Sequence, residues 1–229
     1  MMATVLCGIM TLSRKSFQLS IETIPDGTNS SARDARRDLI IATARDAFFT
    51  HGYAGTAMSA IAAQVGGSKT TLWRHFPSKQ DLFVAVIDDL VGRYGQALTM
   101  PLEPGEPLEP ALRRFAEALM GTILSAPIIA LHRVVTGEAA RFPELGALFH
   151  ERGPKRGKER LARFLEAAMA HGHIRRGDPM IAARQFAGLC QSGVFQDSVF
   201  GVAGPINPDD VRRDIDAAID TFLRGWRTA

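Results

Sequence analysis

The sequence has little cysteine and no long apolar run. Its 229 residues include two cysteines, Cys7 and Cys190, which share no CxxC or Cys/His spacing typical of a metal site. This pattern does not indicate a disulfide framework, so a reducing compartment such as the cytoplasm fits the chain. No stretch reaches the roughly 18 uncharged apolar residues that would span a bilayer. We therefore predict a cytoplasmic protein with no metal site and no membrane contact.

Features that catalysis requires are also missing. The C-terminal two-thirds of the chain has no nucleophile beside a base and no carboxylate pair suited to acid–base chemistry. His171 and His173 are close in sequence, but their spacing does not align both rings on one helix face, so a turn is expected there. No glycine-rich phosphate loop follows a strand. These absences predict a protein that is not an enzyme and that holds no cofactor.

Strand-like alternation is scarce, whereas apolar residues recur at helical spacing over most of the chain. A first helix is expected to open with a capping box formed by Ser31 and Asp34 and to end at His51-Gly52. Two short helices follow, one after Thr56 and one over 68–76. A fourth helix is expected from a second capping box at Ser78 and Asp81 to Leu98. Later helices are expected at 108–125, 127–141, 143–152, 154–171, 178–199 and 208–226.

The chain is long enough for one core of about 200 residues or for two smaller ones. Residues 1–31 do not fit a secretory signal, because Arg14 and Lys15 follow the apolar stretch instead of preceding it. The proline-rich stretch 101–107 marks a linker. We predict an all-α protein of about nine or ten helices. Its expected parts are a flexible extension (1–31), a three-helix helix-turn-helix domain (32–78) and a C-terminal helical bundle (79–229).

The stretch from Met58 to Phe76 carries the most specific pattern. Two helices joined by a short turn can cross steeply only if the contact residue is small and the turn can bend. Ala62 supplies the small contact, Gly66 tolerates a positive φ, and Leu72 fills the space between the helices. The predicted core of this helix pair is Ile61, Ala62, Val65, Gly66, Leu72 and Phe76.

This packing leaves the other face of the second helix exposed. Its N-terminal turn would enter the major groove of DNA, where short hydroxylated side chains let the backbone approach base edges. Lys and Arg outnumber Asp by seven to three between residues 33 and 80, the sign that a phosphate-binding face requires. Thr56 and Lys79 stand at helix starts and are expected to contact phosphates. The predicted DNA-binding residues are Thr56, Ser68, Lys69, Thr70, Thr71, Trp73, Arg74, His75 and Lys79.

Residues 34–85 resemble the DNA-binding signature of TetR/AcrR regulators. The shared pattern is Phe48-x4-Tyr53-x2-Thr56, followed by Ile61-Ala62-x3-Gly66-x-Ser68-Lys69-x-Thr71-Leu72-x3-Phe76-x2-Lys79-x2-Leu82. The resemblance implies a dimer on a near-palindromic operator and a C-terminal ligand-binding domain. Two departures are Gly67, where an apolar residue is usual, and Trp73, where tyrosine is usual. Without the resemblance, a helical hairpin with no DNA role is the alternative for this segment.

Residues 131–145 resemble the regulatory half of AcrR-like members, which implies a helical pocket for a small, often apolar or cationic effector. Plain core is the alternative for the apolar residues of this region. The last two helices, about 179–200 and 209–226, are expected to form a homodimer interface, and packing within one chain is the alternative. The expected pocket region comprises Phe115, Leu119, Met120, Ile123, Val134, Val135, Phe149, Phe164, Met169, Phe186 and Cys190.

These observations predict a transcriptional regulator, a repressor whose affinity for double-stranded operator DNA falls when an unidentified small molecule binds. Two alternatives stay open. One is an architectural DNA-binding dimer that senses nothing, which a ligand-dependent loss of operator affinity would exclude. The other is a helical enzyme that uses the C-terminal cavity, which substrate turnover by the purified protein would support.

Overall fold

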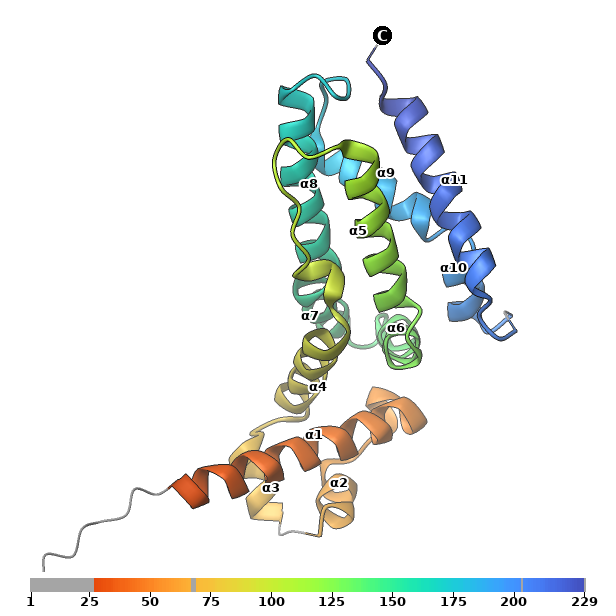
Figure 1. The fold of residues 1–229 in the computed structure, drawn as a ribbon. Coiled ribbons are helices and arrows are strands. Elements are labelled where there is room, and N and C mark those ends of the chain that lie inside the picture. The colour runs from red at the N-terminus through yellow and green to blue at the C-terminus, as the bar shows by residue number, and fades with distance from the viewer. Residues whose placement is uncertain (1–26, 67–68, 203, 229) are drawn as a thin grey trace, which may run out of the picture.

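A computed structural model describes residues 27–66, 69–202 and 204–228, and every regular element in these ranges is a helix (Figure 1). The predicted all-α fold is confirmed. In chain order the elements are α1 (Gly27–Gly55), α2 (Met58–Gln64), α3 (Lys69–His75), α4 (Lys79–Tyr94), the 3₁₀ helix η1 (Gln96–Leu98), α5 (Leu108–Ile123), α6 (Ala126–Glu138), α7 (Pro143–Arg152), α8 (Pro154–Ala170), α9 (Pro179–Cys190), α10 (Val194–Phe200) and α11 (Pro208–Trp226).

The first helix differs from its prediction at the N-terminal end. It begins at Gly27, so residues 27–31 belong to α1 and not to the expected extension, and residues 1–26 lie outside the described part of the chain. At the other end the backbone leaves the helical conformation at Gly52, with φ 71° and ψ 172°. This conformation is accessible to glycine at little cost, which explains why the main part of α1 stops where His51-Gly52 predicted.

Local signals place most other helix ends. The Ser78 hydroxyl accepts a hydrogen bond from the Asp81 N–H at 3.0 Å, as the predicted capping box requires. Prolines stand at the first positions of α7, α8 and α11, where no backbone N–H is needed. α4 ends at Tyr94, short of the predicted Leu98, because the chain tightens into η1 after Gly95.

The helix predicted over 178–199 is broken into α9 and α10. Gly193 leaves the helical region with φ −119° and ψ −112°, and the Asp214 carboxylate of α11 accepts a hydrogen bond from the Val194 N–H at 2.8 Å. A Cβ atom at position 193 would collide with that carboxylate. A side chain 20 positions away therefore starts α10, which is why local periodicity missed the break.

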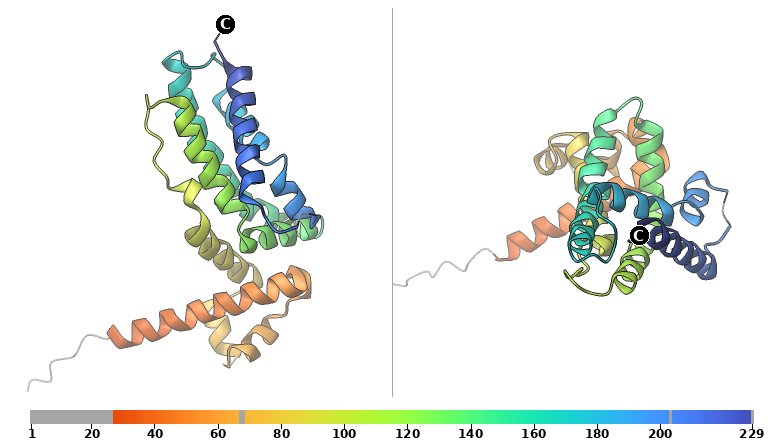
Figure 2. Two further views of the ribbon diagram at one scale, coloured as in Figure 1. Left: turned by 45° about the vertical axis from the view of Figure 1, so that its right-hand side comes forward. Right: turned by 90° about the horizontal axis from the view of Figure 1, so that it is seen from above.

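Two clusters of buried side chains hold the helices together. One lies among α5, α8, α9 and α11 in the C-terminal bundle. The other joins α1–α4 to α6 and α7, and it includes the edge-to-face rings of Phe48, Tyr53 and Phe83 together with the fully buried Leu131 and Leu145. The predicted boundary between residues 78 and 79 therefore crosses a continuous core. α4 runs from this core into the bundle (Figure 2).

Among the described residues, no single helix is long and apolar enough to cross a membrane. The pair α5 and α6 passes the same test of length and composition only when taken together, and the two helices are bent by 70° at their junction. α5 contributes buried side chains to the cluster of the C-terminal bundle, and α6 contributes to the cluster that includes α1–α4.

Candidate DNA-binding surface and ligand cavity

The contact between α2 and α3 is formed by small and apolar side chains. Ile61, Ala62 and Leu72 are each no more than 4% exposed, and Val65 packs half-buried against the same cluster. Gly66 has φ 68°, and a Cβ atom there would meet nothing within 4 Å. Glycine suits this position because of its backbone conformation and not because of space. Each helix has only seven residues, so both depend on this packing.

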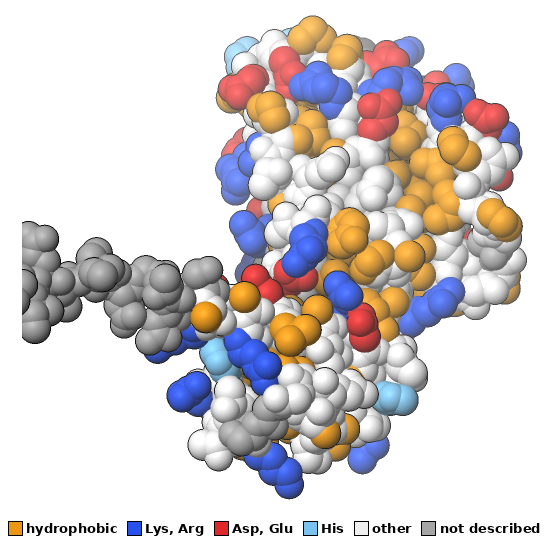
Figure 3. All heavy atoms as spheres, turned by 60° about the horizontal axis from the view of Figure 1, so that its bottom comes forward, with side chains coloured by type: hydrophobic (Ala, Val, Ile, Leu, Met, Phe, Trp, Pro, Cys, Tyr) orange, Lys and Arg blue, Asp and Glu red, His pale blue; other side chains and the backbone are white. Residues whose placement is uncertain are grey.

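The opposite face of α3 lies on the surface. Trp73 is 45% exposed, Thr71 and His75 are half-buried, and Ser68 lies outside the described residues. Figure 3 shows Lys and Arg side chains gathered over the end of the molecule that α1–α3 form. This end of the protein offers a basic surface around a short helix. The exposed residues of α3 are Lys69, Thr70, Trp73 and Arg74.

Arginines of α1 extend the same basic surface toward the C-terminal end of α3. Burial lowers the pKa of His75, and the positive charges of Arg74, Arg33, Arg37 and Arg36 lower it further. At neutral pH the His75 ring is therefore predominantly uncharged. The attraction of this surface for phosphate comes from its arginines and from Lys69.

Thr56 lies inside the protein, so its predicted contact with DNA is wrong for the side chain. Only 4% of Thr56 is exposed, and its hydroxyl lies 2.7 Å from the Gly52 carbonyl oxygen and 3.1 Å from that of Ala47. A hydroxyl has a single proton, which is shared between these two acceptors. Nor does Thr56 cap α2, because the cap residue is Ala57 and makes no side-chain hydrogen bond. Thr56 instead closes the kinked end of α1.

Lys79 also contacts the kinked end of α1. Its Nζ donates to the carbonyl oxygens of Tyr53 at 2.8 Å and Thr56 at 3.1 Å, and it lies 4.5 Å from the centre of the Tyr53 ring. Burial lowers the pKa of this ammonium, the carboxylate of Glu138 raises it, and the charge of Arg141 lowers it. Two of its three N–H donors are used within the protein, so Lys79 anchors α4 to α1 and has one donor left for a phosphate.

Glu138 connects α6 to the kinked end of α1. Its Oε1 accepts a hydrogen bond from the Ala54 N–H at 2.7 Å. A Cβ atom on Gly52 would lie 2.9 Å from the same oxygen, so the glycine also permits the close approach of α6. In the sequence alone, Glu138 does not differ from a solvated surface charge. No local pattern could correct this, because the partner lies 84 positions away in the chain.

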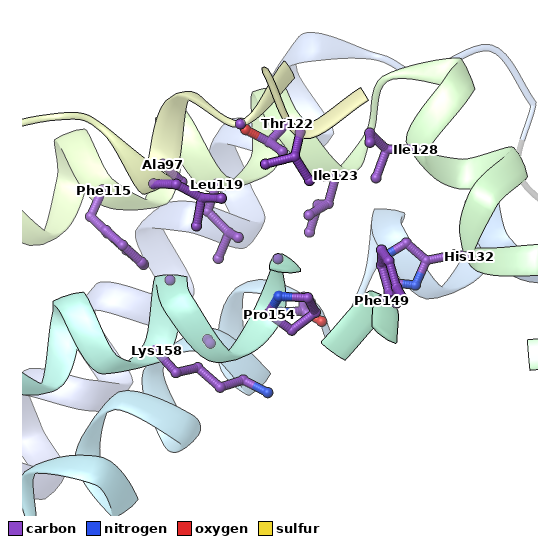
Figure 4. A pocket seen from close by; sticks show the side chains of 17 residues that line it. Ala97, Phe115, Leu119, Thr122, Ile123, Ile128, His132, Phe149, Pro154 and Lys158 are labelled. Atoms are coloured by element: carbon purple, nitrogen blue, oxygen red, sulfur yellow. The ribbon is translucent and has the colours of Figure 1, made fainter. Parts of the chain in front are cut away.

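A cavity of about 110 Å³ lies in the C-terminal bundle, walled by η1 and by residues of α4, α5, α6, α7, α8 and α9 (Figure 4). Of the predicted pocket residues, Phe115, Leu119, Ile123 and Phe149 line it. The others are absent from its wall and belong to the surrounding packing: Met120, Val134, Val135, Phe164, Met169, Phe186 and Cys190. Helical spacing finds buried positions but cannot tell core from cavity wall, so for these residues the pocket role stays a prediction.

Two groups, one at the cavity and one in the core of the bundle, have perturbed acid–base properties because they are buried. Burial lowers the pKa of His132, which lines the cavity, to about 4. Its ring lies edge-on to Phe149 at 4.8 Å and to Phe195 at 5.1 Å between centres. Burial raises the pKa of the Cys190 thiol to about 12, so this cysteine is an inert core residue. Sequence reasoning missed His132 because a single histidine in a helix carries no pattern.

The last helices pack largely within the chain. The apolar stripe of α11, including Ile215, Ile219 and Phe222, is buried against the rest of the C-terminal bundle. Exposed apolar side chains of the last helices lie on α9 and α10: Ile181 of α9 is 47% exposed and Phe200 of α10 is 75% exposed. The expected contact with a second copy would therefore use the outer faces of these helices.

The structure combines a short helix that has an exposed basic face, a second short helix packed against it, and a helical bundle with a cavity. This combination defines a helix-turn-helix regulator. Residues 40–86 match the family described as bacterial regulatory proteins, tetR family, and residues 110–228 match the AefR-like transcriptional repressor, C-terminal domain. The chain belongs to the TetR family of bacterial regulatory proteins.

Solved structures share the whole fold. The flavonoid-responsive regulator FrrA is 33% identical, superposes with a TM-score of 0.73, and is matched over 85% of this chain and 98% of its own. A TetR-family regulator from Mesorhizobium loti is 26% identical with a TM-score of 0.72, over 86% of this chain and 98% of its own.

Curated relatives match over a smaller share of the chain. The transcriptional activator FasR of Mycolicibacterium smegmatis is 35% identical over 91 residues, 38% of this chain and 42% of FasR. The regulator RutR of Escherichia coli K12 is 38% identical over 65 residues, 28% of this chain and 31% of RutR. This chain thus matches less than half the length of either relative. Both relatives are transcriptional regulators by name.

Proposed function

We propose that this protein binds operator DNA as a homodimer and represses transcription until a small molecule occupies the cavity. The exposed face of α3, with Lys69 and Arg74 beside the arginines of α1, carries this proposal. Phosphate contacts from such side chains position a helix, and the hydroxyls of Thr70 and Thr71 would lie near base edges. The C-terminal match to AefR-like repressors supports repression, whereas FasR is named an activator.

The cavity supports the sensing half of the proposal. α6 lines it through Ile128 and His132, and six residues further on Glu138 contacts Ala54 of α1. That interval corresponds to about 9 Å along a helix. A ligand that fits the cavity better after α6 has shifted favours a state in which the contact with α1 is altered. FrrA, which is named for its response to flavonoids, supports control by a small molecule.

In a dimer, operator recognition depends on the distance between the two copies of α3. Two copies of α3 must lie about 34–36 Å apart to enter successive major grooves on one face of DNA. The exposed apolar side chains of Ile181 and Phe200 support pairing through the elements at about 179–200 and 209–226. Because the proposed partner is an operator on the bacterial chromosome, the proposal also includes a cytoplasmic location.

Selection of bound sequences from a random DNA pool tests the proposal. We expect a consensus of two inverted half-sites with centres about one helical turn apart. Lys69→Ala should weaken binding to this consensus and reduce the slope of log affinity against log salt by about one. Lys155→Ala, in which an ion-paired lysine of α8 is removed instead, should leave both unchanged. Failure to select any sequence, or an unchanged salt slope for Lys69→Ala, would contradict the proposed surface.

A further inference from the structure

The wall of the cavity is apolar except at a few positions. The Thr122 hydroxyl lies 2.6 Å from the Tyr94 carbonyl oxygen and 2.8 Å from that of Ala118, so its only proton is used inside the protein. The other polar side chains of the wall belong to His132, Lys158 and Gln191. A bound molecule therefore meets apolar groups over most of its surface and a small number of polar groups that fix its orientation.

Lys158 is the cationic residue that borders this cavity, and in Figure 4 its side chain extends away from Thr122 and Ile123, so its ammonium lies toward the edge of the cavity. Two neighbouring cations of α8 have partners: Lys155 pairs with Glu151, and Arg160 donates to the Met100 carbonyl oxygen. Lys158 has no ion pair within the described ranges, and it is half-buried. It stands near the start of α8, where the helix dipole adds positive potential. A negative group on a ligand would be attracted to this ammonium in partly desolvated surroundings, where charge pairs are stronger than in water.

His132 supplies a different kind of contact. It is uncharged at neutral pH, so one ring nitrogen donates and the other accepts a hydrogen bond. Its described neighbours include the rings of Phe149 and Phe195, and no hydrogen bond to His132 occurs in the part of the chain that the structure covers. In Figure 4 the ring lies beside Phe149 at the cavity. A polar substituent on a ligand would satisfy this imidazole.

The size of the cavity limits what fits. A protein cavity of about 150 Å³ lined by apolar side chains admits benzene. At about 110 Å³ this cavity matches a compound of a single ring with modest adjustment of its wall. The rings and branched chains that line it, including Phe115, Phe149 and Ile123, favour a flat apolar body.

We propose that the effector is a single-ring aromatic carboxylate with a hydroxyl group, held by its carboxylate at Lys158 and by its hydroxyl at His132. This inference rests on the proposed role of the cavity as the effector site. The carboxylate pairs with the ammonium, the ring packs among the apolar side chains, and the hydroxyl hydrogen-bonds the imidazole.

Calorimetric titration of the full chain with 4-hydroxybenzoate, 4-hydroxybenzamide and benzoate tests these contacts one at a time. We expect 4-hydroxybenzoate to bind at least tenfold more tightly than the uncharged amide, which lacks the ion pair. Lys158→Met should weaken the acid about tenfold and leave the amide unchanged, while Lys155→Met should change neither. His132→Phe should reduce the affinity for 4-hydroxybenzoate to that for benzoate.

The proposal is overturned if none of the acids binds, if the amide binds as tightly as the acid, or if Lys158→Met leaves the acid's affinity unchanged. A second measurement separates this from the proposed function. If 4-hydroxybenzoate binds as described but operator affinity stays the same at saturation, the ligand chemistry holds and the effector role fails. If a different, uncharged compound releases operator, the effector role holds and the carboxylate assignment fails.

Discussion

Replacement of Glu138 by alanine should loosen the joint between the bundle and the DNA-binding helices. In the wild-type protein the Glu138 carboxylate accepts the Ala54 N–H at 2.7 Å, beside the kink at Gly52. Hydrogen bonds to charged groups contribute about 1.5–3 kcal/mol, and the half-buried position of Glu138 places this one near 2 kcal/mol. For a protein of this size a loss of about 2 kcal/mol lowers the melting temperature by roughly 4–8 °C.

Thermal unfolding followed by circular dichroism measures this loss, with two control variants. Glu138→Gln keeps an oxygen acceptor for Ala54, so its melting temperature should fall by less than half as much as that of Glu138→Ala. Glu166→Ala removes an exposed carboxylate of α8 and should melt like the wild type. The reasoning is refuted if Glu138→Ala melts with the wild type, or if Glu138→Gln melts as low as Glu138→Ala, because then the hydrogen bond is not what stabilises the joint.

Three further changes test other parts of the structure. Thr56→Val removes a buried hydroxyl and should cost about 1 kcal/mol in urea unfolding, while a reduced salt slope of operator binding at unchanged stability would instead support a phosphate contact. Gly66→Val forces a β-branched residue to positive φ and should cost about 1–3 kcal/mol and weaken operator binding; Gly66→Asn should be milder, and equal effects would argue against backbone strain. Because burial lowers the pKa of His132 to about 4, the unfolded chain binds this proton first and the wild type loses stability as pH falls from 6.5 to 4. His132→Phe should flatten that loss in melting curves, and an identical pH dependence would show that the ring is not buried in solution.

Much of the fold could be predicted from local patterns. The capping box at Ser78, the prolines at helix starts and the glycine at position 66 each act on neighbouring backbone, so their effects are readable in a short window. The core of the α2–α3 pair follows from the spacing of Ala62, Gly66 and Leu72 for the same reason.

The contacts that the sequence did not reveal share one cause. Thr56 and Lys79 carry side chains suited to phosphate, yet both hydrogen-bond to the end of α1, and a sequence window cannot show that the carbonyl oxygens of Gly52 and Tyr53 lie within reach. The break before Val194 and the contact of Glu138 likewise depend on residues 20 and 84 positions away.

The sequence by itself determined that this chain is helical, where most helices begin and end, and which face of α3 is polar, because these properties depend on neighbours within a few turns. Only the tertiary structure decided which polar groups are used internally and which apolar residues border the cavity. Those outcomes depend on contacts between segments far apart in the chain, such as Ala54 with Glu138. Packing between helices likewise brings His132 and Lys158, from α6 and α8, to one cavity.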